Sequence, residues 1–254
     1  MKQISMVSLY GQKRGDLERL IKKCWEMISV SIFRRVFEPY HINQIHGTII
    51  GMEKLIGFDD PFNANIWQVS GNKVTMMYAE LLNIIARHLP MTIRFGGFDK
   101  DYKEFTSFGK TPYERSFQVQ WPTFKFTLIG WPHKDLNFTS KQILWDPRHE
   151  IETRCNIKHK YENDNDLFMV LGGIEGLQLL TDSELDELKS KSASLEETVR
   201  EYLRKNPVDV EITAEQVFLA QYSRETLSLD STNVYCIQNP GIHADFIQSL
   251  YSEG

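Results

Sequence analysis

A histidine and a threonine stand two residues apart at the head of an apolar run, QIHGTIIGME, which covers residues 44–53. If this run is a strand, the alternation of side chains puts His46 and Thr48 on one face and Gly47 and Ile49 on the other. A protonated imidazole and a hydroxyl both donate hydrogen bonds, and an imidazole also exchanges a proton near neutral pH. The spacing therefore favours a paired contact with an anion such as phosphate. An ordinary polar residue at a strand end is the alternative role for His46.

Basic and aromatic residues elsewhere in the chain could complete such a site. Arg94 in TIRFGG and Arg115 in PYERSF lie in or beside β-prone runs, and either would supply the local positive charge that a phosphate needs. Surface ion pairs are the alternative role for both arginines. His159 and Tyr161 lie in NIKHKYENDND, directly before the apolar run LFMVLGGI, from where they could reach the rim of the same site.

The composition excludes several classes of function. The 254 residues include 29 Lys and Arg against 34 Asp and Glu, so the net charge of −5 gives no general attraction to DNA or to an anionic membrane. The three cysteines lack CxxC or CxH spacing, which argues against a zinc site or a disulfide framework. No Walker-type loop, GxSxG elbow or dinucleotide fingerprint occurs, and no apolar stretch approaches the roughly 18 residues of a membrane helix. We therefore expect a cytoplasmic protein without a cofactor, whose oligomeric state the sequence leaves open.

Carboxylates alternate along YENDNDLF, where Glu162, Asp164 and Asp166 stand at every second position. Three carboxylates at this spacing could hold a hard cation, but the run lacks the glycine and the terminal glutamate of an EF-hand loop. We therefore expect a solvated acidic turn and no metal site.

Hydrophobic periodicity predicts an alternation of strands and helices. The predicted strands cover 3–10, 46–51, 91–98, 116–121, 124–131, 167–174, 208–222 and 228–237. The predicted helices cover 17–32, 74–88 and 143–157, two short segments within 181–196, and one segment through 195–202, with a loop over 58–73. The order β-α-β-α-βββ-α-β-α-ββ indicates an α+β fold in which mostly antiparallel sheets carry helices on their outer faces.

This order, with HGTI on the strand that follows the first long helix, resembles the two-histidine (2H) phosphoesterase superfamily and its LigT-like fold. Members of that family have two similar lobes around a central cleft, and each lobe contributes one His-x-Thr/Ser motif. Residues 46–49 match the first motif, while FEPYHINQI, TIRFGGF and DVEITAEQVFLAQY are similar to other parts of the family pattern. The resemblance implies one bilobal domain over 1–254, with lobes of 1–90 plus the C-terminal strands and of 91–180, closed by 181–254.

The second motif of the family is missing. In FMVLGGI, Phe168 stands where the resemblance places the second histidine, and Val170 stands where it places the threonine. In the family's scheme one imidazole takes a proton from water and the other gives one to the leaving oxygen, while the hydroxyls hold the phosphate. Phenylalanine can do neither.

Two hypotheses about function therefore remain open. The resemblance implies a metal-independent phosphodiesterase-like protein that binds or hydrolyses a nucleotide or an RNA-terminal, cyclic phosphodiester through the remaining His46 and Thr48. The alternative is a catalytically inactive binding or scaffold protein on the same fold, in which Phe168 and Val170 form an apolar wall that stacks a base or packs against a partner.

Overall fold

The computed structural model describes residues 2–13, 15–133 and 143–251. Its strands are β1 (Gln3–Ser8), β2 (Phe37–Pro39), β3 (Gly47–Gly51), β4 (Met91–Phe95), β5 (Phe117–Gln120), β6 (Lys125–Pro132), β7 (Leu167–Ile174), β8 (Val208–Ile212), β9 (Val217–Tyr222) and β10 (Thr232–Cys236). Its α-helices are α1 (Gly15–Ser29), α2 (Ala64–Ser70), α3 (Leu81–His88), α4 (Pro112–Arg115), α5 (Trp145–Cys155), α6 (Asp182–Lys205) and α7 (Ala244–Ser249). Short 3-10 helices cover Ile32–Arg35, Leu177–Leu179 and Ala214–Gln216.

These strands join into one ten-stranded sheet with the order β10-β9-β1-β3-β7-β6-β4-β8, to which β2 adds beside β7 and β5 beside β6. Neighbouring strands of the described chain pair antiparallel throughout. Helices alternate with the strands along the chain. The predicted α+β class is therefore confirmed.

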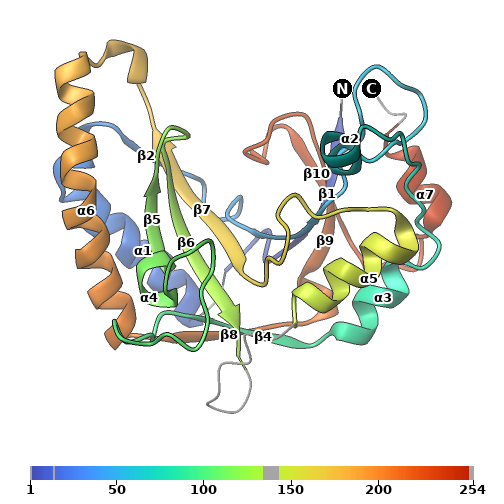
Figure 1. Cartoon of the computed structure of the whole chain (residues 1–254), viewed down its shortest axis with the longest axis horizontal. Helices are drawn as coiled ribbons and strands as arrows, with labels where there is room; N and C mark the ends of the chain where they lie inside the picture. The colour runs from blue at the N-terminus through green and yellow to red at the C-terminus, as the bar shows by residue number, and fades with distance from the viewer. Residues whose placement is uncertain (1, 14, 134–142, 252–254) are drawn as a thin grey trace.

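Two groups of strands meet at the middle of the sheet. In Figure 1, β5, β6 and β7 stand in the left half of the molecule, and β1, β9 and β10 stand in the right half. Within the described residues, β3 and β7 are joined by one bridged pair, Gly47 with Met169. A Cβ atom on residue 47 would lie 2.5 Å from the Leu167 side chain, so a glycine lets β3 approach β7 this closely. The lobe boundaries given above stay a prediction.

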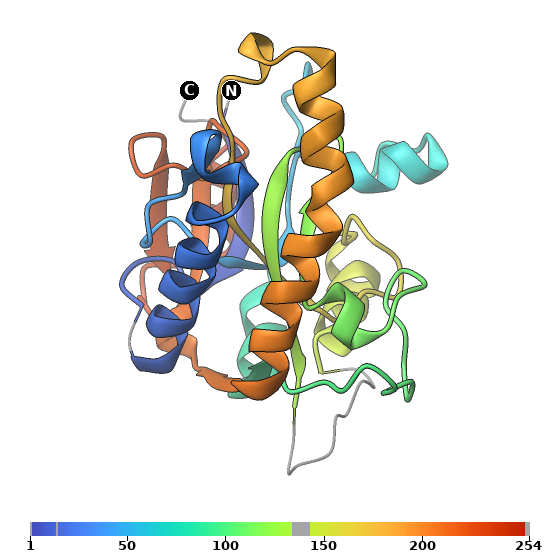
Figure 2. The same cartoon turned by 90° about the vertical axis from the view of Figure 1, so that its left-hand side faces the viewer.

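Two long helices cover one face of the sheet, and Figure 2 shows both α1 and α6 in front of the strands. The buried side chains of each recur at helical spacing, which is why these segments fold as amphipathic helices. They are Leu17, Leu20, Ile21, Cys24 and Ile28 in α1, and Leu188, Ser192, Leu195, Val199 and Leu203 in α6. No helix in the described part of the chain combines the length and the apolar character that crossing a bilayer requires.

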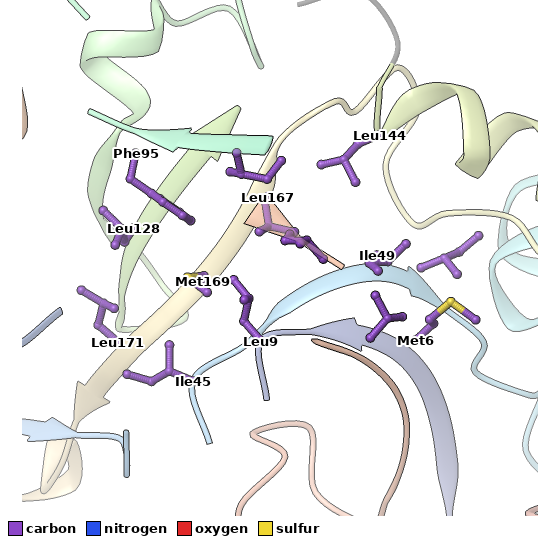
Figure 3. Packing of buried hydrophobic residues seen from close by; sticks show 14 of the residues in the cluster. Met6, Leu9, Ile45, Ile49, Phe95, Leu128, Leu144, Leu167, Met169 and Leu171 are labelled. Carbon is purple, nitrogen blue, oxygen red and sulfur yellow. The ribbon is translucent and has the colours of Figure 1, made fainter. Parts of the chain in front are cut away.

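The core continues through the junction between β3 and β7. Figure 3 shows Leu9, Ile49, Leu167 and Met169 gathered there, and all four side chains are buried. Because each buried aliphatic side chain contributes about 1.5–3 kcal/mol, this packing fixes the relative position of the two central strands. The side chains that β3 and β7 direct away from this core are therefore also held at fixed relative positions.

The predicted loop over 58–73 contains a helix that the periodicity did not indicate. Helix α2 buries none of its residues, so it carries no apolar stripe, and it begins because the Asn63 side chain accepts a hydrogen bond from the Ile66 amide at 2.9 Å. The helix predicted over 74–88 begins only at Leu81. The residues that precede Leu81 lie outside the helix, and Thr75 among them forms an isolated β-bridge with Phe62.

Two further elements differ from their predicted boundaries. Residues 182–205 form one helix rather than three, because a single buried stripe runs through its whole length after the capping box of Thr181 and Glu184. The strand predicted over 208–222 is divided into β8 and β9 by a 3-10 turn, which the side chains of Thr213 and Gln216 cap. The two halves then pair with different strands, β8 with β4 and β9 with β1.

Candidate functional site

A cavity of about 1160 Å³ opens where the two groups of strands meet. One wall takes lining residues from β1, β3 and β9, and the other takes them from β5, β6 and β7. The residues predicted from the sequence that line it are His46, Thr48, Arg115, His159, Tyr161 and Phe168. Arg94 and Val170 are not among its described lining residues. The structure therefore brings most of the predicted site together from segments far apart in the sequence.

His46 lies half-buried on the cavity wall, directly before β3. Its Nδ1 is 2.7 Å from the carbonyl oxygen of Gln44, and since a carbonyl can only accept, Nδ1 carries the proton and the lone pair is on Nε2. Burial lowers the pKa of His46 to about 4, and the positive charge of Lys13 adds to this effect. The free imidazole is therefore neutral at pH 7 and suited to accept a proton, whereas the sequence suggested a protonated donor.

Thr48 lies half-buried on the same wall, and its backbone is held by a buried arginine from α5. Arg148 donates from Nη2 to the Thr48 carbonyl at 3.0 Å and from Nε to the Ile49 carbonyl at 2.7 Å. The same guanidinium donates to the carbonyls of Asp164 at 2.9 Å and Asp166 at 3.2 Å, just before β7. One side chain, only 4 % exposed, therefore ties the two walls of the cavity together.

The register between β3 and β7 places the histidine–threonine pair opposite two apolar residues. Gly47 pairs with Met169, so the residues on either side of Met169, which are Phe168 and Val170, stand across from the pair on β3. Phe168 is half-buried and lines the cavity. Neither side chain has a titratable group, so this position on the second wall supplies no proton donor.

His159 lies on the far wall, where a carboxylate fixes its ring. Its Nε2 is 3.2 Å from Oδ2 of Asp164, and Nδ1 is buried without a hydrogen-bond partner among the described residues. Burial lowers the pKa of His159 to about 4, and the nearby charge of Arg148 contributes. Tyr161, which is 48 % exposed, packs edge-on against this ring and stands at the mouth of the cavity.

Arg115 lines the cavity, but its charge is already paired. It donates from Nε and Nη2 to Oδ2 of Asp166 at 2.9 and 2.7 Å, and Ser107 donates to the same oxygen at 3.0 Å. The guanidinium also lies 4.3 Å from the ring centre of Phe108, which is 54 % exposed at the cavity mouth. Arg115 therefore positions an exposed aromatic ring rather than offering a free cation.

Arg94 takes a different position from the one expected of a cleft residue. It lies on β4 and donates from Nε and Nη2 to the carboxylate of Asp209 on β8, each at 2.6 Å. The sequence left a surface ion pair as the alternative role for Arg94, and the structure shows an ion pair across β4 and β8.

Lysines that the sequence analysis did not single out provide the positive charge of the cavity. Lys54, Lys110, Lys125 and Lys160 line it, and none of them forms an ion pair with the described residues. Single lysines carry no pattern in a sequence, and only the pairing of distant segments brings these four to one surface. An anion in the cavity would meet uncompensated ammonium groups.

Comparison of the sequence with family models finds no match, and comparison with curated proteins finds none either. Among solved structures, the chain is similar to Kluyveromyces marxianus Usb1 with a TM-score of 0.45 and 11 % identity, over 91 % of this chain and 97 % of that one. It is also similar to Kluyveromyces marxianus Usb1 with uridine monophosphate, with a TM-score of 0.42, 13 % identity and the same coverage. At identities this low, the function has to be inferred from the residues of this chain.

Proposed function

We propose that this protein binds a nucleotide or an RNA-terminal phosphate, including a cyclic phosphodiester, in the cavity between β3 and β7. The observation that supports this proposal is the placement of His46 and Thr48 on the wall of a cavity that is also lined by four lysines without ion pairs to the described residues. The Thr48 hydroxyl and the ammonium groups donate to the phosphate oxygens. His46 accepts a proton through Nε2, the ring atom that the hydrogen bond to Gln44 leaves free.

A neutral His46 also supports slow hydrolysis of the bound diester. Nε2 takes a proton from water as the water oxygen bonds to phosphorus, the bond from phosphorus to the leaving oxygen breaks, and solvent protonates that oxygen. In a scheme with two imidazoles the second one would protonate the leaving group, a role that contributes on the order of 10²–10⁴ in rate. Because Phe168 cannot take this role, tight binding with slow turnover is the expected behaviour.

The alternative function is that of a binding or scaffold protein without any turnover. The position of Phe168 on the cavity wall favours this alternative. An aromatic ring on the cavity wall suits stacking of a base or packing against a partner. A ligand that binds only the folded state at a hundred times its Kd adds about 2.7 kcal/mol to stability, so a nucleotide-binding protein shows a clear shift in Tm. A scaffold that recognises only a protein shows none.

The decisive experiment combines titration calorimetry with a hydrolysis assay. The ligands are 2′,3′-cyclic nucleotides and nucleoside 3′-monophosphates, and the variants are His46→Ala and Thr48→Ala. The matched control is His41→Ala, which removes an exposed histidine a short distance before β3 that does not line the cavity. We expect both cavity variants to weaken binding and His46→Ala to abolish turnover, while the control behaves as the wild type. Binding that survives both cavity substitutions would place the ligand elsewhere and end the proposal.

A further inference from the structure

The run that supplies His46 and Thr48 ends in an acidic residue, Glu53, which lines the same cavity. Its Oε1 accepts a hydrogen bond from Ser5 on β1 at 3.1 Å and from Tyr222 on β9 at 2.7 Å. Ser5 and Tyr222 are both buried, and their hydroxyl oxygens lie 3.2 Å apart. Burial raises the pKa of Tyr222 and the carboxylate raises it further, so the phenol keeps its proton and donates. Two donors from two strands therefore hold this carboxylate in one orientation.

The second oxygen of the carboxylate is left open. A Cβ atom on residue 51 would lie 2.4 Å from Oε2 of Glu53, so Gly51 is what lets the carboxylate lie flat against the end of β3. Within the described residues, Oε2 accepts no hydrogen bond, and no Lys, Arg or His nitrogen lies within 4.0 Å of the carboxylate. Ser5 and Tyr222 orient Oε1, and Gly51 leaves room for Oε2, which accepts no hydrogen bond from the described chain.

The register of the sheet fixes the position of this carboxylate relative to the proposed phosphate contact. On β1, Val7 pairs with Thr48 and Ser5 pairs with Gly51. Two residues along a strand cover about 7 Å, so Gly51, against which the open oxygen lies, is about 7 Å along the sheet from Thr48. A nucleotide with its phosphate at Thr48 therefore reaches Glu53 with its base or its sugar.

A fixed carboxylate opposes an anionic ligand unless the ligand brings N–H or O–H donors to it. Among the four RNA bases, only guanine presents two adjacent N–H donors, N1–H and N2–H, on its pairing edge. The open Oε2 of Glu53 has two lone pairs, so it can accept from both of these N–H groups at once. A matched pair of hydrogen bonds to a base edge contributes about 1–3 kcal/mol to discrimination. That range corresponds to a preference of about ten- to a hundredfold.

We infer that Glu53 is a specificity-determining residue that selects guanine in the cavity, with its open carboxylate edge accepting from the guanine pairing edge. This inference rests on the proposed function, since it places the phosphate of the same nucleotide at His46 and Thr48. Ser5 and Tyr222 act as positioning residues, because they touch the carboxylate and not the base.

Titration calorimetry with nucleoside 3′-monophosphates tests the inference in the wild-type protein first. We expect guanosine 3′-monophosphate to bind about ten- to a hundredfold more tightly than the adenosine, cytidine and uridine nucleotides. The inosine nucleotide, which lacks only the 2-amino group, should lose a large part of that preference. Equal affinity for the guanosine and inosine nucleotides would overturn the assignment without the need for any variant.

The variant Glu53→Gln then locates the preference. We expect it to remove the preference for the guanosine nucleotide, while the affinities of the other three stay the same or rise, because the substitution takes a negative charge out of the cavity. The 2′-deoxyguanosine nucleotide is the control for a carboxylate that accepts from the ribose instead. If Glu53→Gln weakens all four ribonucleotides equally, or removing the 2′-hydroxyl causes the same loss in the wild type, the carboxylate does not select the base.

Failure of the proposed function gives a different pattern from failure of this inference. If no nucleotide binds the wild type, both are wrong. If His46→Ala abolishes binding of every nucleotide but the wild type shows no preference among bases, the proposed function stands and the role of Glu53 is rejected. Urea denaturation of Glu53→Gln checks that the variant is folded. If the variant does not fold, the comparison of the guanosine and inosine nucleotides in the wild type still tests the role of Glu53.

Discussion

Replacing Arg148 with leucine is expected to lower the free energy of unfolding by about 3–5 kcal/mol, the cost of breaking a buried charged network. The guanidinium donates to four backbone carbonyls, and a hydrogen bond with a charged partner contributes roughly 1.5–3 kcal/mol, so the four together set an upper bound of about 6–12 kcal/mol. Burying the leucine side chain recovers about 1.5–3 kcal/mol. The substitution also removes the desolvation cost of the buried guanidinium, which recovers several kcal/mol more. The expected net loss is therefore about 3–5 kcal/mol.

Guanidinium chloride denaturation followed by circular dichroism measures this loss. The matched control is Arg154→Leu on the same helix, because Arg154 is half exposed and its ion pair with Glu80 lies at the surface. We expect that control to lose less than about 1 kcal/mol. The variant Arg148→Lys keeps the charge but not the planar fork of donors, so it should fall between leucine and the wild type. A loss for Arg148→Leu as small as that of the control would mean that the guanidinium does not hold the two walls together.

Three further outcomes are expected. Gly47→Ala should lose about 1–3 kcal/mol of stability in a denaturation series because its Cβ would lie 2.5 Å from a leucine side chain, whereas Gly173→Ala, whose Cβ would meet only an ordinary 3.6 Å contact, should change little. The pKa of His46 is lowered to about 4, below the 6.5 of the unfolded chain, so the unfolded state binds more protons between these values and stability should fall as the pH drops from about 6.5 to 4. Because the pKa of His159 is lowered to about 4 as well, His46→Gln should remove only part of this fall, and an unchanged profile would contradict the assignment. Phe168→His should raise hydrolysis of 2′,3′-cyclic guanosine monophosphate by about 10²–10⁴, measured by chromatography, and this gain should disappear when His46 is also replaced by alanine.

The local elements follow from the sequence because their causes are local. The alternation of HGTIIG predicts a strand on which His46 and Thr48 share a face, and both line the cavity. The apolar spacing of residues 17–28 predicts helix α1, and each of the expected stripe positions there is buried. Hydrophobic periodicity does not predict helix α2, because this helix buries no residue and begins at an asparagine cap within a run rich in loop-forming residues.

The site is only partly predictable, because its charges depend on partners far away in the chain. Arg115 and Arg94 stand in the expected β context, yet Arg115 pairs with Asp166 and Arg94 pairs with Asp209, which are 51 and 115 residues distant. Alternating carboxylates likewise suggest a solvated turn, whereas Asp164 and Asp166 are buried beside arginines. Charge pairing of this kind depends on tertiary contacts, which no local pattern encodes.

The role of Arg148 explains why a cavity exists at the centre of a continuous sheet. If the ladder between β3 and β7 were complete, opposite side chains such as Thr48 and Phe168 would stand about 4.5–5.5 Å apart at Cβ and would leave no room for a ligand. Only one bridged pair joins these strands in the described structure, and the guanidinium donates to the carbonyls of Thr48 and Ile49 on one side and of Asp164 and Asp166 on the other. The arginine thus donates to the backbone of both walls and connects them where strand pairing is limited to one bridge. Because the same contacts support Thr48 on one side and the carboxylate partners of His159 and Arg115 on the other, loss of this guanidinium should affect ligand affinity as well as stability.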